Sequence, residues 1–334
     1  MDILIAVAIV VLLGLALKFF RPSLGSLFFR RIRFWPVILI AGSLMLFWIT
    51  ISAPGDPVDI IAGQHASEEV RELVRNEYGF NRPWVEQYAD YYSGFFRCEW
   101  GTSYRFRGES VCELVVEHAK VSGPIGLATA MFIPIGIALG IYMAWRKGSW
   151  LETVFFVNTQ LYIVVPSLIT IQFIILFFSV KLGWLPAGWQ GGWEGIFSKS
   201  AIIPVATLAI GSIAGMAHFV RTIAINVVDE QYITAAKAKG LSTFQILRKY
   251  VLGNVRSPVI TVLAPVAFTF FEGSFFVETI YGIPGLARFM IDSVFGRDYP
   301  VILTVGFLSI LTALVVNLTQ DVLYHLDPRV NLTE

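Results

Sequence analysis

Residues 301–323 read VILTVGFLSILTALVVNLTQDVL, and this stretch decides the fold class. It contains one charged residue, Asp321, and as a helix it is long enough to cross a hydrocarbon core about 30 Å thick. Outward from it, apolar blocks of similar length predict six further spans. These lie at about 34–53, 121–145, 153–179, 201–220 and 258–277, with a shorter block at 3–20. We therefore expect an all-α polytopic membrane protein.

The composition agrees with this class. Of 334 residues, 56% are hydrophobic and 15% are charged, whereas about 25% are charged in an average soluble domain. The formal net charge of +1 gives no reason to expect a nucleic-acid partner. Cys98 and Cys112 are the two cysteines, and their spacing is not that of a zinc or iron–sulfur site. We expect no metal and no cofactor in this chain.

Basic residues in the connections predict the orientation, because lysine and arginine near span ends are retained in the cytoplasm. One side of the predicted spans carries fourteen of them, and the short loops of the other side carry four. The fourteen are Lys18, Arg21, Arg30, Arg31, Arg33, Arg146, Lys147, Arg221, Lys237, Lys239, Arg248, Lys249, Arg256 and Arg329. The four are Lys181, Lys199, Arg288 and Arg297. We expect a multi-pass protein of the plasma or inner membrane with its C-terminus in the cytoplasm.

Four segments follow from this topology. Residues 1–20 are predicted to form an extra N-terminal transmembrane helix, and residues 21–53 a basic cytoplasmic connection and the first core span. Residues 54–118 are predicted to form an extracytoplasmic cap, and residues 119–334 the transmembrane core. Aromatic residues offer the cap an apolar core; they are Trp84, Tyr88, Tyr91, Tyr92, Phe95, Phe96 and Trp100.

Both cysteines fall within the predicted cap, where thiols would meet an oxidising medium. A bridge between Cys98 and Cys112 would stabilise the cap by roughly 3 kcal/mol, because it restricts the unfolded chain. The sequence fits two free, partly buried thiols as well.

Residues 229–242 read DEQYITAAKAKGLS and are unusually polar for a connection between two spans. Alanine with interspersed lysine favours a helix, and Gly240 stands where a left-handed residue commonly ends one. A second helix from about Thr243 to Val251 would lead back towards Pro258 and the membrane. A rigid cytoplasmic element of this kind, at about 229–252, can transmit a displacement. The alternative is a solvated connector whose charges only enforce topology.

The same segment resembles a known family. Thr234-Ala235-Ala236 followed by Gly240 resembles the E-A-A-x-x-x-G motif of ABC importer permeases, and the run from Tyr232 to Ser242 is similar to the oligopeptide/dipeptide class. Residues 53–57 (APGDP), 78–83 (YGFNRP), 277–286 (VETIYGIPGL) and 297–300 (RDYP) match that class in its order. Thr234 stands where the general motif has glutamate, a variation that peptide-class permeases tolerate.

The resemblance implies a type I importer fold with six core helices and a division of labour among subunits. This chain would pair with a second related permease, contact two ATPase subunits that bind ATP and Mg²⁺, and receive cargo from an extracytoplasmic binding protein. The implied contacts with the ATPase are Tyr232, Thr234, Ala235, Ala236, Lys237, Lys239, Gly240 and Leu241. The outer-loop motif comprises Glu278, Pro284, Gly285, Asp298 and Pro300. The sequence has no G-x-x-x-x-G-K-[ST], so we expect no enzyme activity of its own.

Other functions compete with an oligopeptide permease. The same machinery could import oligosaccharides, because selectivity in this family resides largely in the binding protein. An ion-coupled secondary transporter would be expected to show internal symmetry and charges within its spans, and neither is evident. An intramembrane hydrolase would be expected to carry H-E-x-x-H or G-x-S-x-G, and the sequence has neither.

Overall fold

The computed structural model describes residues 22–326, apart from residues 64, 107, 273 and 274. The described chain is helical, with an isolated antiparallel bridge between Thr102 and Ser110, so the predicted all-α class is confirmed. The extra helix predicted over residues 1–20 lies outside the described residues. The described chain forms two compact units, which are residues 22–119 with 286–326 and residues 120–285.

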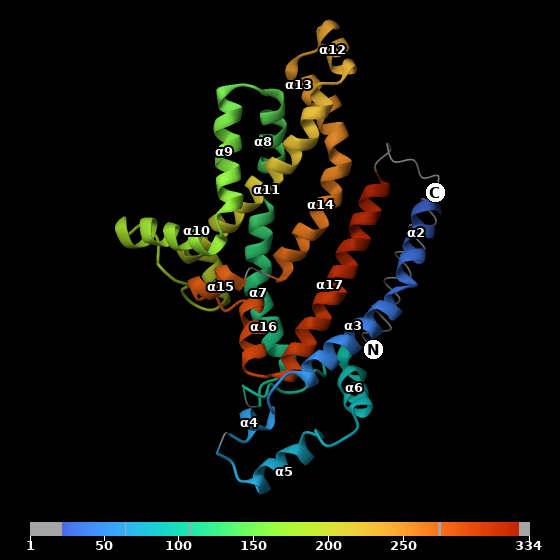
Figure 1. Cartoon of the computed structure of the whole chain (residues 1–334), viewed down its shortest axis with the longest axis vertical. Helices are drawn as coiled ribbons and strands as arrows, with labels where there is room; N and C mark the ends of the chain where they lie inside the picture. Colours follow the sequence, from blue (N-terminus) through green and yellow to red (C-terminus); the bar gives the residue numbers. More distant parts are fainter. Residues whose placement is uncertain (1–21, 64, 107, 273–274, 327–334) are drawn as a thin grey trace. The chain divides into compact units, whose positions relative to one another are not determined.

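The first unit is built on an antiparallel pair of long helices, α3 (Trp35–Ser52) and α17 (Tyr299–His325). α2 (Pro22–Ile32) precedes α3, and the break between them coincides with Pro36, which has no N–H to continue the helical hydrogen bonds. Figure 1 shows short helices beyond the C-terminal end of α3. The remaining helices of this unit are α4 (Val58–Ile61), α5 (Glu68–Glu77), α6 (Trp84–Ser93), the start of α7 (Val111–Ala130) and α16 (Leu286–Phe295).

Aromatic residues predicted to form a core within the cap also pack on the long helices. The ring of Tyr88 lies 5.6 Å from that of Phe47 on α3, and the ring of Phe95 lies 4.3 Å from that of Phe307 on α17. A neighbouring core joins α7, α16 and α17. It contains Val111, Leu114, Val115, Phe289, Val301 and Val305. The short helices are therefore fixed to the ends of the long ones.

The second unit is built around α11 (Ile202–Val228), which packs along α8 (Ile133–Trp145). Glycine makes this contact close. A Cβ at Gly140 would lie 2.6 Å from the carbonyl oxygen of Ala217, and a Cβ at Gly136 would lie 2.9 Å from that of Ile213. Glycine at these two positions therefore serves packing, because the two helix backbones approach more closely than any side chain would allow.

The rest of the second unit surrounds this pair (Figure 1). α9 and α10 follow α8, α12 and α13 lie beyond the end of α11, and α14 runs back from them. The bounds are α9 (Trp150–Val164), α10 (Ser167–Ile174), the π-helical η2 (Ile175–Lys181), α12 (Gln231–Ala238), α13 (Thr243–Ile246), the π-helical η5 (Leu247–Val251), α14 (Leu252–Glu272) and α15 (Phe275–Tyr281).

Four helices of the described chain are long and apolar enough to cross a membrane, or five if one bent pair counts as a span. The four are 24–52, 111–145, 199–228 and 299–325. The bent pair replaces the single span predicted over 153–179: it turns by 110° between Val164 and Leu168. Pro166 explains the bend, because a proline disfavours helical geometry in the residue before it, and Val165 is extended.

Candidate functional site

The candidate coupling segment is α12 with the turn that follows it. Gly240 has φ +76°, the left-handed conformation that glycine adopts without a steric penalty. The N–H of Gly240 donates to the carbonyl of Lys237 at 3.0 Å, and the N–H of Leu241 donates to that of Ala236 at 3.3 Å. This pair of bonds is a Schellman motif, which satisfies the last carbonyls of the helix and fixes where the chain leaves it.

A second cap begins the next helix immediately. The Ser242 hydroxyl accepts from the N–H of Gln245 at 3.3 Å, and the Gln245 side chain accepts from the N–H of Ser242 at 2.9 Å. This reciprocal capping box starts α13, which continues through η5 into α14. The turn between α12 and α13 is thus defined by hydrogen bonds on both sides.

One side of α12 is buried and the other is exposed. Ile233 and Ala236 are buried, and Leu241 packs beside them on the same core. That core includes Ala144 at the end of α8 and Ala224 near the end of α11. The exposed positions include Tyr232, Thr234, Ala235, Lys237, Lys239 and Gly240, followed by Phe244, which is 70% exposed. The segment is anchored to the membrane helices and still offers a free surface.

Polar and aromatic contacts add to this anchoring. The Lys237 ammonium lies 4.7 Å from the centre of the Trp145 ring on α8, and Tyr232 stacks on Tyr250 at 6.2 Å. The Lys147 ammonium donates to Asp229 at 2.7 Å, which joins the turn after α8 to the end of α11, just before α12. Contacts to two helices and to the following segment make α12 a rigid element.

A buried ion pair lies in the same unit, between α9 and α11. The Arg221 guanidinium contacts the Glu152 carboxylate at 2.5 Å and also lies 4.3 Å from the centre of the Phe156 ring. The side chains are 19% and 8% exposed. Sequence reasoning placed Arg221 at the cytoplasmic end of its span and missed Glu152, whose only signal was that it is the one charged residue of α9.

Two residues of the predicted outer-loop motif, Glu278 and Gly285, lie together in the second unit. The Glu278 carboxylate is buried and accepts from the Ser122 hydroxyl at 2.7 Å. A Cβ at Gly285 would lie 2.3 Å from that carboxyl carbon, so a glycine is required for this packing. Pro284 precedes it in the turn after α15. Pro284 and Gly285 thus form a turn that packs on the buried Glu278 carboxylate.

The other two residues of that motif lie in the first unit. Asp298 is fully buried and accepts from the N–H of Tyr104 at 3.1 Å and from the Ser103 hydroxyl. Pro300 follows it in the first turn of α17, and its carbonyl accepts from the Tyr91 hydroxyl. These bonds attach the loop at 103–105 and helix α6 to the start of α17. Burial and the Asp298 carboxylate both raise the pKa of Tyr104.

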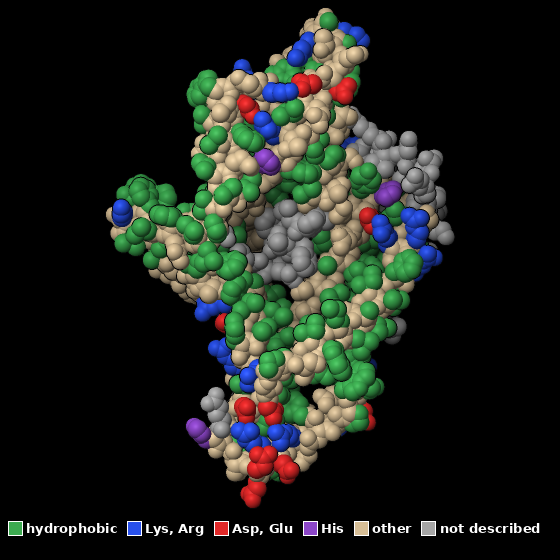
Figure 2. All heavy atoms as spheres, in the orientation of Figure 1, with side chains coloured by type: hydrophobic (Ala, Val, Ile, Leu, Met, Phe, Trp, Pro, Cys, Tyr) green, Lys and Arg blue, Asp and Glu red, His purple; other side chains and the backbone are tan. Residues whose placement is uncertain are grey.

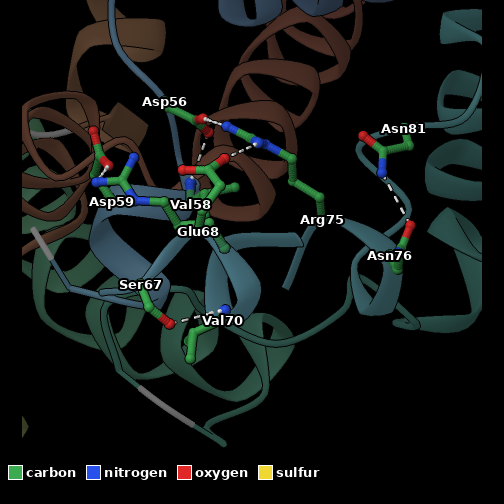
Figure 3. Close-up of polar contacts among 10 residues, drawn as sticks. Asp56, Val58, Asp59, Ser67, Glu68, Val70, Arg75, Asn76 and Asn81 are labelled. Atoms are coloured by element: carbon green, nitrogen blue, oxygen red, sulfur yellow. Dashed lines mark hydrogen bonds and ion pairs between the residues drawn. The ribbon is translucent and has the colours of Figure 1, made fainter. Parts of the chain in front are cut away.

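A charged network that sequence reasoning did not single out organises the start of the cap (Figure 3). Arg75 on α5 donates to Asp56 at 2.8 Å and to Glu68 at 3.3 Å, and the N–H of Val58 donates to Asp56 at 2.9 Å. Burial raises the pKa of Asp56, but the bond from Arg75, the bond from Val58 and the nearby arginine charges outweigh it and lower the pKa overall. The sequence contained one signal for this network: Arg71 and Arg75 are four residues apart, so they lie on one face of α5.

Cys98 and Cys112 are joined by a disulfide in this structure, with their Cα atoms 5.6 Å apart. The bridge connects the turn after α6 to the first turn of α7. Among the described residues, no group of three or more His, Cys, Asp or Glu side chains could hold a metal ion.

The helices that are long and apolar enough to cross a membrane define a polytopic membrane protein. The chain belongs to the family of binding-protein-dependent transport system inner membrane components, which matches residues 136–332. The family's N-terminal membrane component matches residues 25–113. The chain is therefore a multi-pass inner membrane protein and a permease component of an ABC importer.

Relatives cover nearly the whole chain. An oligopeptide transport system permease of Haemophilus influenzae is 30% identical over 92% of this chain and 99% of its own. An oligopeptide transport system permease of Bacillus subtilis is 32% identical over 88% and 95%. A glutathione transport system permease of Shigella flexneri is 32% identical over 86% and 92%.

A solved structure has the same fold. A chain of the MetNI methionine ABC transporter in an inward-facing conformation matches with a TM-score of 0.53 and 16% sequence identity. The match covers 66% of this chain and 100% of that one. The helical arrangement is thus that of an ABC importer transmembrane subunit.

Proposed function

We propose that this permease imports oligopeptides, with a second related permease, two ATPase subunits and an extracytoplasmic binding protein. The cargo is supported by the relatives, two of which are named for oligopeptides and one for glutathione, itself a short peptide. ATP and Mg²⁺ would bind to the ATPase subunits, because this sequence has no phosphate-binding loop. The chain itself would then be a transport subunit without enzyme activity.

The coupling role rests on α12. Its buried side is fixed to α8 and α11, while Thr234, Ala235 and Lys239 remain exposed. A helix held in this way can pass a displacement of a bound ATPase to the membrane helices, because a rigid element does not absorb it. We assign the contact with the ATPase to this exposed side and to Phe244 after the turn.

The topology follows from the same assignment. Lys237, Lys239, Arg248 and Lys249 lie on or beside the coupling segment, and basic residues are retained in the cytoplasm. The C-terminus would lie on that side, and residues 54–118 would lie outside with the Cys98–Cys112 bridge. The two pieces of the outer-loop motif would then stabilise extracytoplasmic turns around Glu278 and Asp298.

A matched pair of alanine substitutions tests the coupling assignment. Ala235 is exposed on α12, and Ala89 is exposed on α6 in the cap. We expect Ala235→Glu to leave the two permeases associated but to reduce co-purification with the ATPase, or its stimulation by loaded binding protein, at least tenfold. Ala89→Glu should retain both. Normal coupling in Ala235→Glu would show that α12 is not the contact.

The cargo is tested separately with the binding protein encoded beside this gene. We expect calorimetry to detect binding of peptides of a few residues, and membranes carrying the complete transporter to take up the same peptides when ATP is present. If the binding protein bound oligosaccharides but not peptides, the proposed cargo would be wrong and the permease role would stand. Uptake driven by an ion gradient without ATP would contradict both.

A further inference from the structure

A groove lies in the first unit, which does not contain the coupling segment. It lies between the α2–α3 junction and the C-terminal part of α17, and its volume is about 470 Å³, within the range of roughly 300–1,000 Å³ for small-molecule sites. Its walls are Phe34, Trp35 and Ile38 on one side and Leu314, Asn317 and Leu318 on the other. Arg31, Gln320 and Asp321 line one end.

The lining changes from charged to apolar along the groove. Arg31 and Asp321 face each other at 2.8 Å at one end, and Ile38 and Leu314 line the other. Leu314 and Asp321 are seven positions apart on α17, which is about 10 Å of helical rise. Leu314, Asn317, Leu318 and Asp321 share one face of α17, because three and four residues are one turn apart. An occupant must therefore be amphipathic, with its polar part near Arg31.

The charges around the groove determine which charge the polar part of an occupant can carry. Arg31 is neutralised by Asp321, but its neighbours Arg30 and Arg33 have no carboxylate partner among the residues that the structure describes. The Arg33 guanidinium lies 4.7 Å from the centre of the Phe34 ring, which keeps its charge beside the groove. Figure 2 shows basic side chains gathered over α2. Because these two arginines pair with no described carboxylate, their charges favour an anionic occupant.

We propose that this groove binds an anionic phospholipid of the inner leaflet. The phosphate would lie near Arg30, Arg31 and Arg33, with Asn317 and Gln320 available as hydrogen-bond donors, and an acyl chain would follow Ile38 and Leu314. Basic pockets between membrane helices bind lipid headgroups in this way, and each arginine near the headgroups contributes about fivefold in affinity. The bound lipid would fill the space between α3 and α17 at the membrane surface.

The test measures lipid retained by the purified, delipidated transporter complex with native mass spectrometry. Phosphatidylglycerol should bind at least tenfold more tightly than phosphatidylcholine. Arg30→Gln with Arg33→Gln should weaken phosphatidylglycerol binding about fivefold for each arginine removed. Asn317→Trp changes no charge but fills the groove, so it should abolish the preference. Arg146→Gln, at the end of α8 and outside the groove lining, is the control for the loss of one arginine and should behave as the parent.

Three results would overturn the proposal. Equal binding of the two lipids would remove the selectivity. Sensitivity to the arginine variants without sensitivity to Asn317→Trp would indicate diffuse attraction to a basic surface and not a groove. Displacement of phosphatidylglycerol by millimolar inorganic phosphate would indicate a site for soluble anions.

Discussion

The substitution Gly240→Val changes the turn at which the chain leaves α12 and does not disturb the packing of the rest of the molecule. A Cβ at this position would meet nothing within 4 Å, so valine introduces no clash with neighbours. Its cost is conformational, because Gly240 has φ +76° and a β-branched residue there costs about 1–2 kcal/mol or more. The membrane helices have no reason to change.

The strain competes with the two bonds of the turn. Leaving the left-handed conformation would break the bonds from Gly240 and Leu241, which contribute about 0.5–1.5 kcal/mol each. The conformational cost of valine and the energy of the two hydrogen bonds are similar. A large fraction of molecules should therefore lose the native direction in which the chain leaves α12. Leu241 would then lose its fixed position against the core. We expect poor coupling, with hydrolysis that responds weakly to loaded binding protein.

Two variants make the assay specific. Gly240→Asn should couple better than Gly240→Val, because asparagine adopts the left-handed conformation more readily. Gly183→Val places the same residue at φ +65° in another open turn, and it should couple normally. The assay compares assembly of the permeases, co-purification of the ATPase and stimulated hydrolysis. Parental coupling in Gly240→Val, or equal loss in Gly183→Val, would refute the role given to this turn.

Three further predictions concern stability and redox state. Neither Cys98 nor Cys112 should react with a thiol reagent in intact membranes until a reductant is added; ready labelling of both would exclude the bridge. Glu152→Ala should destabilise the protein by about 1–3 kcal/mol in denaturant unfolding, because it removes the carboxylate partner of the partly buried Arg221. Asp229→Ala, which removes an exposed pair, should lose less than about 1 kcal/mol. Equal losses would contradict this difference. The lowered pKa of Asp56 predicts that its ion pair stabilises the cap above the ordinary value of 3.8 and is lost as the pH falls through the lower folded value. Arg75→Gln should therefore reduce the stability of the cap at neutral pH. It should also make that stability depend less on pH below 3.8, and an unchanged pH profile would count against the network.

The sequence predicted the local structure of the coupling segment closely. Alanine and lysine indicated the helix, Gly240 indicated its end, and the structure has a helix to Ala238 followed by a left-handed glycine. These signals are local, because helix propensity and capping depend on residues within one or two turns. The second helix from Thr243 was predicted for the same reason, although its π-helical part was not.

Tertiary contacts were harder to predict. The sequence showed Glu278 and Asp298 in motifs but not their partners Ser122 and Ser103, which are 156 and 195 residues away. Glu152 was missed for the same reason, because its partner Arg221 is on another helix. Periodicity identifies which residues lie on one face of an element, but it does not say which element packs on that face.

The packing of α8 on α11 explains how a movement of α12 would reach the membrane helices. The contacts at Gly136 and Gly140 leave no room for even a methyl group, so the two helices have little freedom to slide past each other. The same core continues from Ala144 and Ala224 to Ile233 and Ala236 of α12. A force applied to the exposed side of α12 therefore acts on α8 and α11 together. Under the proposed coupling role, the close packing at Gly136 and Gly140 would make α12 and its membrane helices move as one body.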